Sequence, residues 1–130
     1  MIVVDASVVL EVLLRTPAGS HLESRLFSTD VTLHAPHLLD LEVAQVLRRY
    51  WLRGEVTAHR CAQALADFTG LSIARYPHNL FLSRIWELRG NVTAYDAAYV
   101  ALAEALRAPL LTRDAKLAKA PGHAASIELA

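Results

Sequence analysis

Four carboxylates in this chain stand where folding alone gives no reason for them. Asp5, Glu42, Asp96 and Asp114 are each embedded in apolar sequence, and together they span almost the whole of the 130 residues. A buried acid is costly unless it is paired or bound to a metal ion. Because carboxylate oxygens are hard ligands, such a set suits Mg²⁺ or Mn²⁺ rather than Zn²⁺. We therefore predict a cation site that holds one or two ions.

The chemistry that such a site favours is phosphodiester hydrolysis. Two divalent ions about 4 Å apart can activate water and stabilise the leaving oxygen of an in-line displacement. No lysine or histidine general base is then required, because metal coordination lowers the pKa of water. This is the chemistry of a nuclease.

Two of the acids follow apolar runs that read as strands. Asp5 comes directly after Ile2-Val3-Val4, and Asp114 follows Leu110-Leu111-Thr112-Arg113. Ligands of open α/β sheets bind at the carboxyl ends of the strands, so both positions suit chemistry. The alternative for each is ordinary N-capping of the helix that follows, and either residue taken singly leaves that alternative open.

Glu42 is placed on the apolar face of a predicted helix. Three of its four neighbours at three and four positions away are apolar, so an unpaired carboxylate does not belong there. The alternative is a buried ion pair, for which Arg49, almost in line two helical turns further on, is the candidate partner.

Asp96 comes three residues after Thr93, which is a capping-box spacing, although that box prefers Glu or Gln at its fourth position. Its stripe of the helix also carries Val92, Tyr99 and Val100, so the carboxylate is expected to point toward the core side. Capping and a functional role both remain open for Asp96.

The elements that position these residues alternate along the chain. Short β-branched or apolar runs predict strands at residues 2–4, 31–34, 71–74, 110–112 and 126–129. Helical periodicity, with Pro and Gly as boundaries, predicts helices at residues 6–14, 20–28, 36–53, 57–68, 80–88 and 93–107 and a short one from 114. Because no hairpin signal intervenes, we predict an α/β fold: one domain, residues 1–130, with a parallel β-sheet of about four to five strands flanked by helices on both faces.

Composition excludes several classes of protein. Hydrophobic residues make up 54% of the chain, yet no run approaches the roughly 20 residues that cross a bilayer, and the first residues do not form a signal peptide. The single cysteine, Cys61, rules out an internal disulfide and a thiolate metal cluster. We expect a soluble, cytoplasmic protein that does not bind membranes.

Competing motifs are weak. Five glycines form no phosphate-binding loop, and Asp5-Ala6-Ser7 lacks the second aspartate of aspartate-based phosphatases. His34 and His37 could form a metal pair only on one helix face, which the intervening Pro36 opposes.

Four blocks of sequence carry a specific resemblance. They are Val3-Val4-Asp5-Ala6-Ser7, Pro36 with Leu41-Glu42-Val43-Ala44, Thr93 to Ala103 around Asp96, and Leu111-Thr112-Arg113-Asp114. In this order and over essentially the full length, the chain resembles PIN-domain proteins and, more narrowly, the VapC toxins of bacterial VapBC toxin–antitoxin modules.

The resemblance implies a function and roles for residues. It implies an endoribonuclease toxin dependent on Mg²⁺ or Mn²⁺, inhibited by a cognate VapB-type antitoxin and assembled as a homodimer. Asp5, Asp96 and Asp114 would hold metal, Glu42 would complete the site, and Ser7 and Thr112 would support ligands or water. The alternative is a catalytically silent PIN-like module that mainly binds antitoxin or RNA. Whether Arg48, Arg49 and Arg53 contact RNA, antitoxin or solvent is left open.

Overall fold

The computed structural model describes residues 1–130 and shows a five-stranded parallel sheet in the order β3-β2-β1-β4-β5. The strands are β1 (Ile2–Val4), β2 (Leu33–Pro36), β3 (Ile73–Tyr76), β4 (Leu110–Thr112) and β5 (Ile127–Leu129). The predicted parallel sheet is confirmed, and the last strand lies at its edge as expected.

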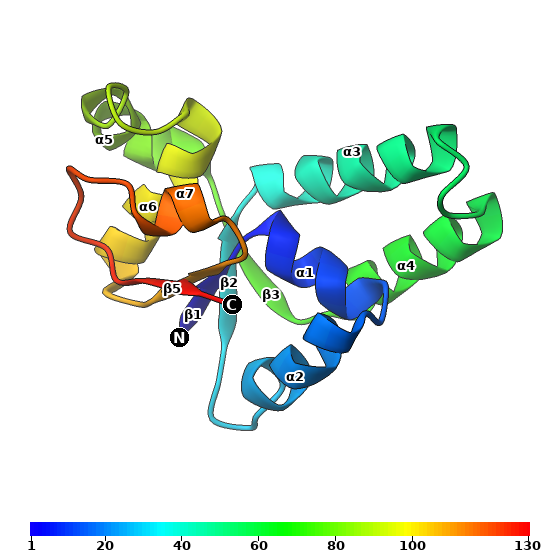
Figure 1. Ribbon diagram of the computed structural model, residues 1–130. Coiled ribbons are helices and arrows are strands. Elements are labelled where there is room, and N and C mark those ends of the chain that lie inside the picture. Colours follow the sequence, from blue (N-terminus) through cyan, green and yellow to red (C-terminus); the bar gives the residue numbers. More distant parts are fainter.

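Helices connect every pair of consecutive strands. They are α1 (Ala6–Leu13), α2 (Pro17–Leu26), α3 (Leu38–Leu52), α4 (Ala58–Gly70), α5 (Leu82–Glu87), α6 (Ala94–Leu106) and α7 (Ala115–Ala118), with a 3-10 turn η1 (His78–Phe81) before α5. In Figure 1, α1 to α4 lie on one side of β1, β2 and β3, whereas α5 to α7 lie on the other. The predicted helical layers on both faces are therefore present. None of the helices combines the length and the apolar content that crossing a bilayer requires.

The strand order creates a switch point between β1 and β4. From β1 the chain builds outward through β2 and β3, and it then returns to the other side of β1 to add β4 and β5. The connections on the two sides of such a point leave a crevice at the carboxyl ends of the two central strands. Asp5 and Asp114 directly follow these ends, after β1 and after the β4–Arg113 segment respectively.

The core is built around α6, which packs against β1, β2 and β4. Every residue from Ala97 to Ala103 is buried, because small alanines let the helix approach the sheet closely. The first turn of α6 projects beyond this packed segment. The fold thus fixes α6 firmly and presents its N-terminal end, with Asp96, at the switch point.

Two strands, β2 and β3, lie two residues further along the chain than predicted, and β5 begins one residue later. The interpretation that Pro36 opens a helix is wrong: Pro36 ends β2, and α3 begins at Leu38 after His37. Burial of His34 in the strand is possible because its ring bonds Thr32 Oγ1 and the Tyr76 hydroxyl, both at 2.8 Å. Likewise β3 extends to Tyr76, as suits a residue held in an extended conformation by the following Pro77.

The junction of α1 and α2 is tight. Thr16 caps α2 by accepting a hydrogen bond from Gly19 N at 3.0 Å, and Pro17 occupies the first helical position. A Cβ at Gly19 would collide with the backbone of Glu11, so only glycine lets α2 pack this closely on α1. This approach also brings the Thr16 hydroxyl onto the Glu11 carboxylate.

Candidate functional site

Asp5 is the most enclosed member of the acidic set. Its Oδ1 accepts hydrogen bonds from Ser7 Oγ at 2.5 Å and from Val8 N at 3.2 Å, and its Oδ2 accepts one from Thr112 Oγ1 at 2.5 Å. Burial raises the pKa of Asp5, and these hydrogen bonds oppose the rise. Asp5 does cap α1, so the capping role and a place in the cluster are both realised by one side chain.

The hydroxyls of Ser7 and Thr112 tie the ends of the two central strands together. Besides donating to Asp5, Ser7 Oγ accepts a hydrogen bond from Arg113 N at 3.0 Å, and Thr112 Oγ1 accepts one from Asp114 N at 3.1 Å. The network runs from the end of β1 to the segment that follows β4. It fixes the backbone of Asp114 relative to Asp5.

Glu42 is held by a residue that the sequence did not single out for the site. The hydroxyl of Tyr99, itself only 1% exposed, donates to Glu42 Oε1 at 2.5 Å. The anticipated alternative, a pair with Arg49, is not formed, since no ion pair of Glu42 is present. The signal for Tyr99 was its place on the same stripe of a helix as Asp96.

Electrostatics link Glu42 to the rest of the cluster. Burial, followed by the negative charges of Asp5 and Asp96, raises its pKa, and the hydrogen bond from Tyr99 opposes this. Burial and the adjacent Glu42 also raise the pKa of Tyr99, which keeps the phenol protonated and donating. Glu42 therefore lies within electrostatic reach of acids from β1 and α6.

Asp96 has much weaker support from neighbouring donors. Its backbone N donates to Thr93 Oγ1 at 3.2 Å, so Thr93 caps α6 as its spacing suggested. Burial, followed by the charges of Asp114 and Asp5, raises the pKa of the Asp96 carboxyl. The hydrogen bond with Thr93 lowers this pKa, but it is the weakest of the four influences. The side chain is half-buried among like charges.

Asp114 is exposed and caps the short helix α7. Its Oδ1 accepts hydrogen bonds from Lys116 N at 2.9 Å and Leu117 N at 3.3 Å. The capping alternative raised for Asp114 is thus also realised. Its second oxygen accepts no hydrogen bond from the protein, and Asp114 and Asp96 line the same pocket.

The four carboxylates converge, but they do not form a closed cage as they stand. No group of three or more His, Cys, Asp or Glu side chains is arranged to hold a metal ion. One oxygen of Glu42, one of Asp114 and both of Asp5 are engaged by protein donors. The donor set nevertheless fits Mg²⁺ or Mn²⁺, since every group is a hard oxygen and like charges crowd together.

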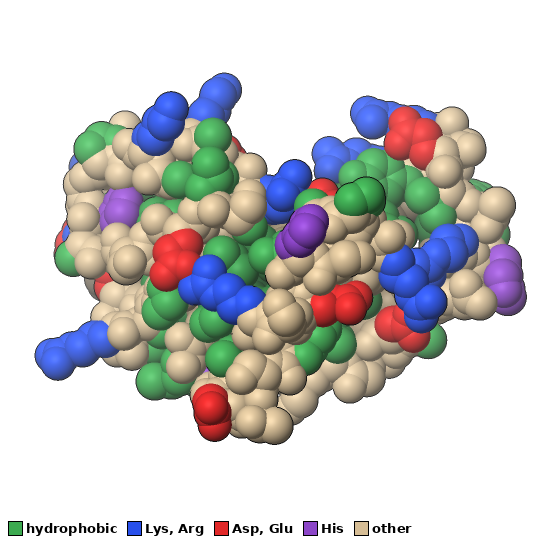
Figure 2. Space-filling view, turned by 60° about the horizontal axis from the view of Figure 1, so that its bottom comes forward, with side chains coloured by type: hydrophobic (Ala, Val, Ile, Leu, Met, Phe, Trp, Pro, Cys, Tyr) green, Lys and Arg blue, Asp and Glu red, His purple; other side chains and the backbone are tan.

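Two pockets flank the cluster. The first, called here the α6–α7 pocket, has a volume of about 410 Å³ and contains Asp96 and Asp114 together with Arg89 and Lys116. The second, the α1–α3 pocket, has a volume of about 300 Å³ and reaches the cluster at Ser7. Figure 2 shows the surface hollowed between two lobes, with Lys and Arg side chains on both rims. A polyanion lying across the cluster would meet positive charge on either side.

The remaining residues that the sequence suggested for binding lie elsewhere. His34 is engaged with Thr32 and Tyr76, so the possible His34–His37 metal pair is not formed. Arg48, Arg49 and Arg53 are exposed along α3 and its C-cap, and of these Arg49 lines the α1–α3 pocket.

Known proteins resemble this chain in sequence and in fold. Residues 2–122 match the family model described as PIN domain. The Mycobacterium tuberculosis protein named Ribonuclease VapC12 is 42% identical over 129 residues, covering 99% of this chain and 98% of that protein. Ribonuclease VapC1 of the same species is 44% identical over 128 residues, covering 98% and 96%. In structure, VapBC2 from Rickettsia felis, solved bound to a promoter DNA fragment, has a TM-score of 0.68 at 14% identity and covers 99% of this chain and 98% of its own.

Proposed function

Because the chain belongs to the PIN-domain family and is of the VapC type, we propose that it is a Mg²⁺- or Mn²⁺-dependent endoribonuclease, the toxin of a type II module restrained by a cognate antitoxin. Relatives that carry the name ribonuclease match it over nearly their whole length. The proposal treats residues 1–130 as one PIN domain that carries the complete site.

The observation that carries the proposal is the convergence of four acids from four segments at the switch point. Asp5 follows β1, Glu42 lies on α3, Asp96 on α6 and Asp114 after β4. Each of Glu42 and Asp96 feels the charge of at least two of the others. A fold gains no stability by gathering acids, so the cost is understandable if a divalent cation binds there.

In the proposed reaction, a bound divalent ion supplies an activated water and charge stabilisation for the leaving oxygen. Asp5, Asp96 and Asp114 would hold that ion, and Glu42 would complete its surroundings. Thr112 and Ser7 orient the Asp5 carboxylate by donating to both of its oxygens. Tyr99 orients Glu42, and, being protonated and buried, it keeps one carboxylate oxygen fixed. Arg89 and Lys116 flank Asp96 and Asp114 and would receive the phosphates of the bound strand.

The proposed partners follow from the family. The substrate is RNA, and the inhibitor is a VapB-type antitoxin, as the name of the VapBC2 neighbour indicates for that protein. Homodimerisation is a further part of the proposal. Large apolar side chains exposed on the surface, among them Leu80, Leu82 and Trp86, are available for protein contacts.

The test is cleavage of single-stranded RNA by the purified chain with millimolar Mg²⁺ or Mn²⁺ and with chelator. We expect cleavage that chelator abolishes and that falls by more than about 100-fold in Asp96→Asn, because losing a ligand costs at least as much as losing a group that supports one. The matched control is Asp40→Asn, an exposed acid of α3 that pairs with Arg75 outside the cluster.

Two results would contradict the proposal. Full activity in a correctly folded Asp96→Asn protein would remove the cluster from the reaction. A wild-type protein that binds antitoxin or RNA tightly but cleaves no RNA would instead identify the silent module.

A further inference from the structure

The α1–α3 pocket lies beside the acidic cluster but is not part of it. Its volume is about 300 Å³, and none of Glu42, Asp96 and Asp114 lines it. The link is Ser7, whose Oγ donates to Asp5 and accepts from the backbone of Arg113. Anything bound in this pocket would therefore sit next to whatever the cluster holds.

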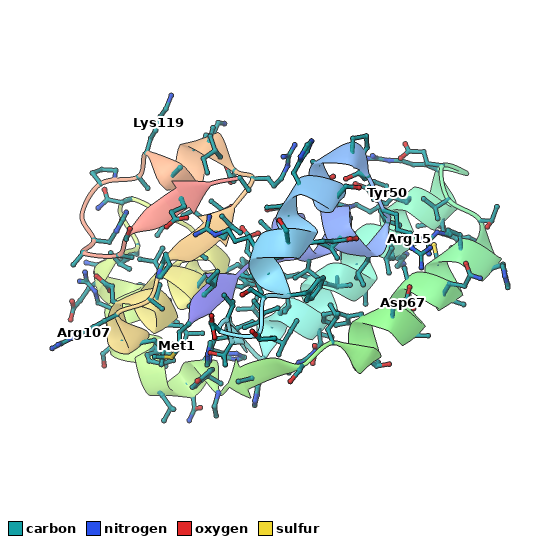
Figure 3. The ribbon with its side chains drawn as sticks, turned by 90° about the horizontal axis from the view of Figure 1, so that it is seen from below. Met1, Arg15, Tyr50, Asp67, Arg107 and Lys119 are labelled. Atoms are coloured by element: carbon teal, nitrogen blue, oxygen red, sulfur yellow. The ribbon has the colours of Figure 1, made fainter.

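The pocket combines an apolar wall with an aromatic ring. Ala6, Leu10 and Leu14 of the α1 segment face Val46 and Tyr50 of α3. Figure 3 shows Tyr50 on the same side of the molecule as Arg15 at the end of α1, and well away from Lys119 after α7. Planar bases bind in single-stranded recognition by stacking on aromatic side chains against apolar surface.

The charge of the pocket is positive on balance. Arg49 and Arg113 line it with one acid, Glu11. Arg113 Nε lies 3.6 Å from Glu11 Oε1, whereas Arg49 makes no ion pair. An arginine without a carboxylate partner at the mouth of a pocket is suited to a phosphate group.

Glu11 is positioned to read the edge of a base. Its side chain is 27% exposed, and its carboxylate is already oriented by Arg113 and by the Thr16 hydroxyl. A carboxylate offers about four lone-pair sites, so acceptor capacity remains on the pocket side. A carboxylate accepts from the exocyclic amino groups of adenine, cytosine or guanine, whereas uracil has no amino group and its single N3–H donor lies between two carbonyl oxygens that repel the carboxylate.

We propose that the α1–α3 pocket is a nucleotide subsite of the RNA-cleaving site, in which Tyr50 holds one base, Arg49 binds a phosphate and Glu11 selects a base with an exocyclic amino group over uracil. The inference rests on the proposed function, because it takes RNA as the ligand. In this proposal, the pocket receives the part of the RNA strand that lies on the α1 side of the scissile bond.

The experiment measures binding of short single-stranded oligonucleotides of adenine, cytosine or uracil to the full chain in chelator, so that cleavage is not required. Wild type should bind the uracil oligonucleotide about tenfold more weakly than the others, and Glu11→Gln should remove that difference. Tyr50→Ala should weaken all three by roughly tenfold, whereas Tyr50→Phe should bind like wild type.

Arg49→Ala should weaken oligonucleotide binding and reduce its salt dependence. The matched control is Arg53→Ala, because Arg53 lies at the same end of α3 but does not line the pocket. Thermal melting establishes that each variant is folded. Equal binding of the three oligonucleotides by wild type, or binding unchanged by Glu11→Gln and Tyr50→Ala, would overturn the proposal.

The two proposals fail in distinguishable ways. If the oligonucleotide preferences hold but RNA is never cut with Mg²⁺ or Mn²⁺, the subsite stands and the nuclease function fails. If RNA is cut while the pocket variants bind like wild type, the pocket serves something else, such as a protein partner.

Discussion

Asp5 and Asp96 belong to the same cluster but are supported in different ways. Asp5 receives donors from Ser7, Val8 and Thr112, and these oppose the effect of burial on its pKa. Asp96 is half-buried, and burial, followed by the charges of Asp114 and Asp5, raises the pKa of its carboxyl, whereas the hydrogen bond with Thr93 is the weakest influence and lowers it. The protein therefore orients one carboxylate with its own hydroxyls and leaves the other without comparable donors. Under the proposed function, the Asp5 half of the site is preformed and the Asp96 half is completed by the bound metal.

Removing one hydroxyl tests whether the Asp5 half is preorganised for chemistry. Thr112→Val preserves shape at a position with no exposed surface, but it takes the donor from Asp5 Oδ2. We expect RNA cleavage to fall by roughly 10- to 100-fold, as is typical when a group that orients a metal ligand is lost. The measurement is kcat/KM at saturating metal.

The control for this change is Thr112→Ser, which keeps the hydroxyl and should retain most of the activity. If Thr112→Val and Thr112→Ser cleave equally, the hydroxyl does not matter and the contrast with Asp96 disappears.

The two acids should affect the stability of the metal-free protein in opposite directions. Asp5→Ala removes the cap of α1 and leaves the buried Thr112 hydroxyl without its acceptor, at a cost of about 2 kcal/mol. Asp96→Asn relieves repulsion from Asp114 and Asp5 and should raise the melting temperature. Calorimetry in chelator measures both, and equal destabilisation would contradict the distinction.

Divalent metal should act mainly through the Asp96 half. A cation at about ten times its dissociation constant stabilises the folded state by about 1.4 kcal/mol, which corresponds to a rise in Tm of roughly 4 °C. Asp96→Asn should lose most of this rise, whereas Asp40→Asn should keep it. A thermal shift titration with Mg²⁺ and Mn²⁺ gives the answer, and an undiminished shift in Asp96→Asn would place the ion elsewhere.

The smallest expected effect is that the difference in stability between Asp96→Asn and wild type depends on pH. The pKa of Asp96 is raised in the folded state, so the folded protein holds its proton more tightly than the unfolded chain does. The protonated Asp96 carboxyl therefore stabilises the folded state at pH values below the ordinary pKa of 3.8, and this stabilisation is lost as the pH rises through the raised pKa. Without metal, Asp96→Asn should therefore become increasingly more stable than wild type as the pH rises from the ordinary to the raised pKa of Asp96. Above that pH the difference in stability should stay constant. If the full difference in stability between Asp96→Asn and wild type is already present at the lowest pH at which the protein folds, the ionisation of Asp96 is not its cause.

Much of this arrangement could be predicted from sequence because it depends on local patterns. A short β-branched run before Asp5 and a short apolar run before Asp114 predicted that both acids follow the carboxyl ends of strands, and the apolar stripe of α6 predicted that Asp96 points toward the core. The boundaries of β2 and β3 could not be placed as well. The predicted strand at residues 31–34 ended at His34, whereas pairing of Ala35 and Pro36 with β3, about 40 residues further along the chain, continues β2 by two residues.

The hydrogen-bond partners of the site residues could not be predicted from the sequence either. The partner of Glu42 is Tyr99, 57 residues further along, whereas helical spacing pointed to Arg49 because it considers one helix at a time. Similarly, the capping and metal hypotheses for Asp5 were weighed as alternatives, although one carboxylate has enough lone pairs to cap α1 and to join the cluster.

The hydrogen bond from Thr112 to Asp5 joins residues separated by 107 positions. At a synthesis rate of about 5 to 20 residues per second, Asp5 therefore waits roughly 5 to 20 seconds for the residue that orients it, and longer for release of Thr112 from the ribosome. A nascent chain that lacks its last strands cannot assemble the site. Under the proposed function, this order of synthesis gives every new molecule an interval in which it is inert and in which an antitoxin can bind first.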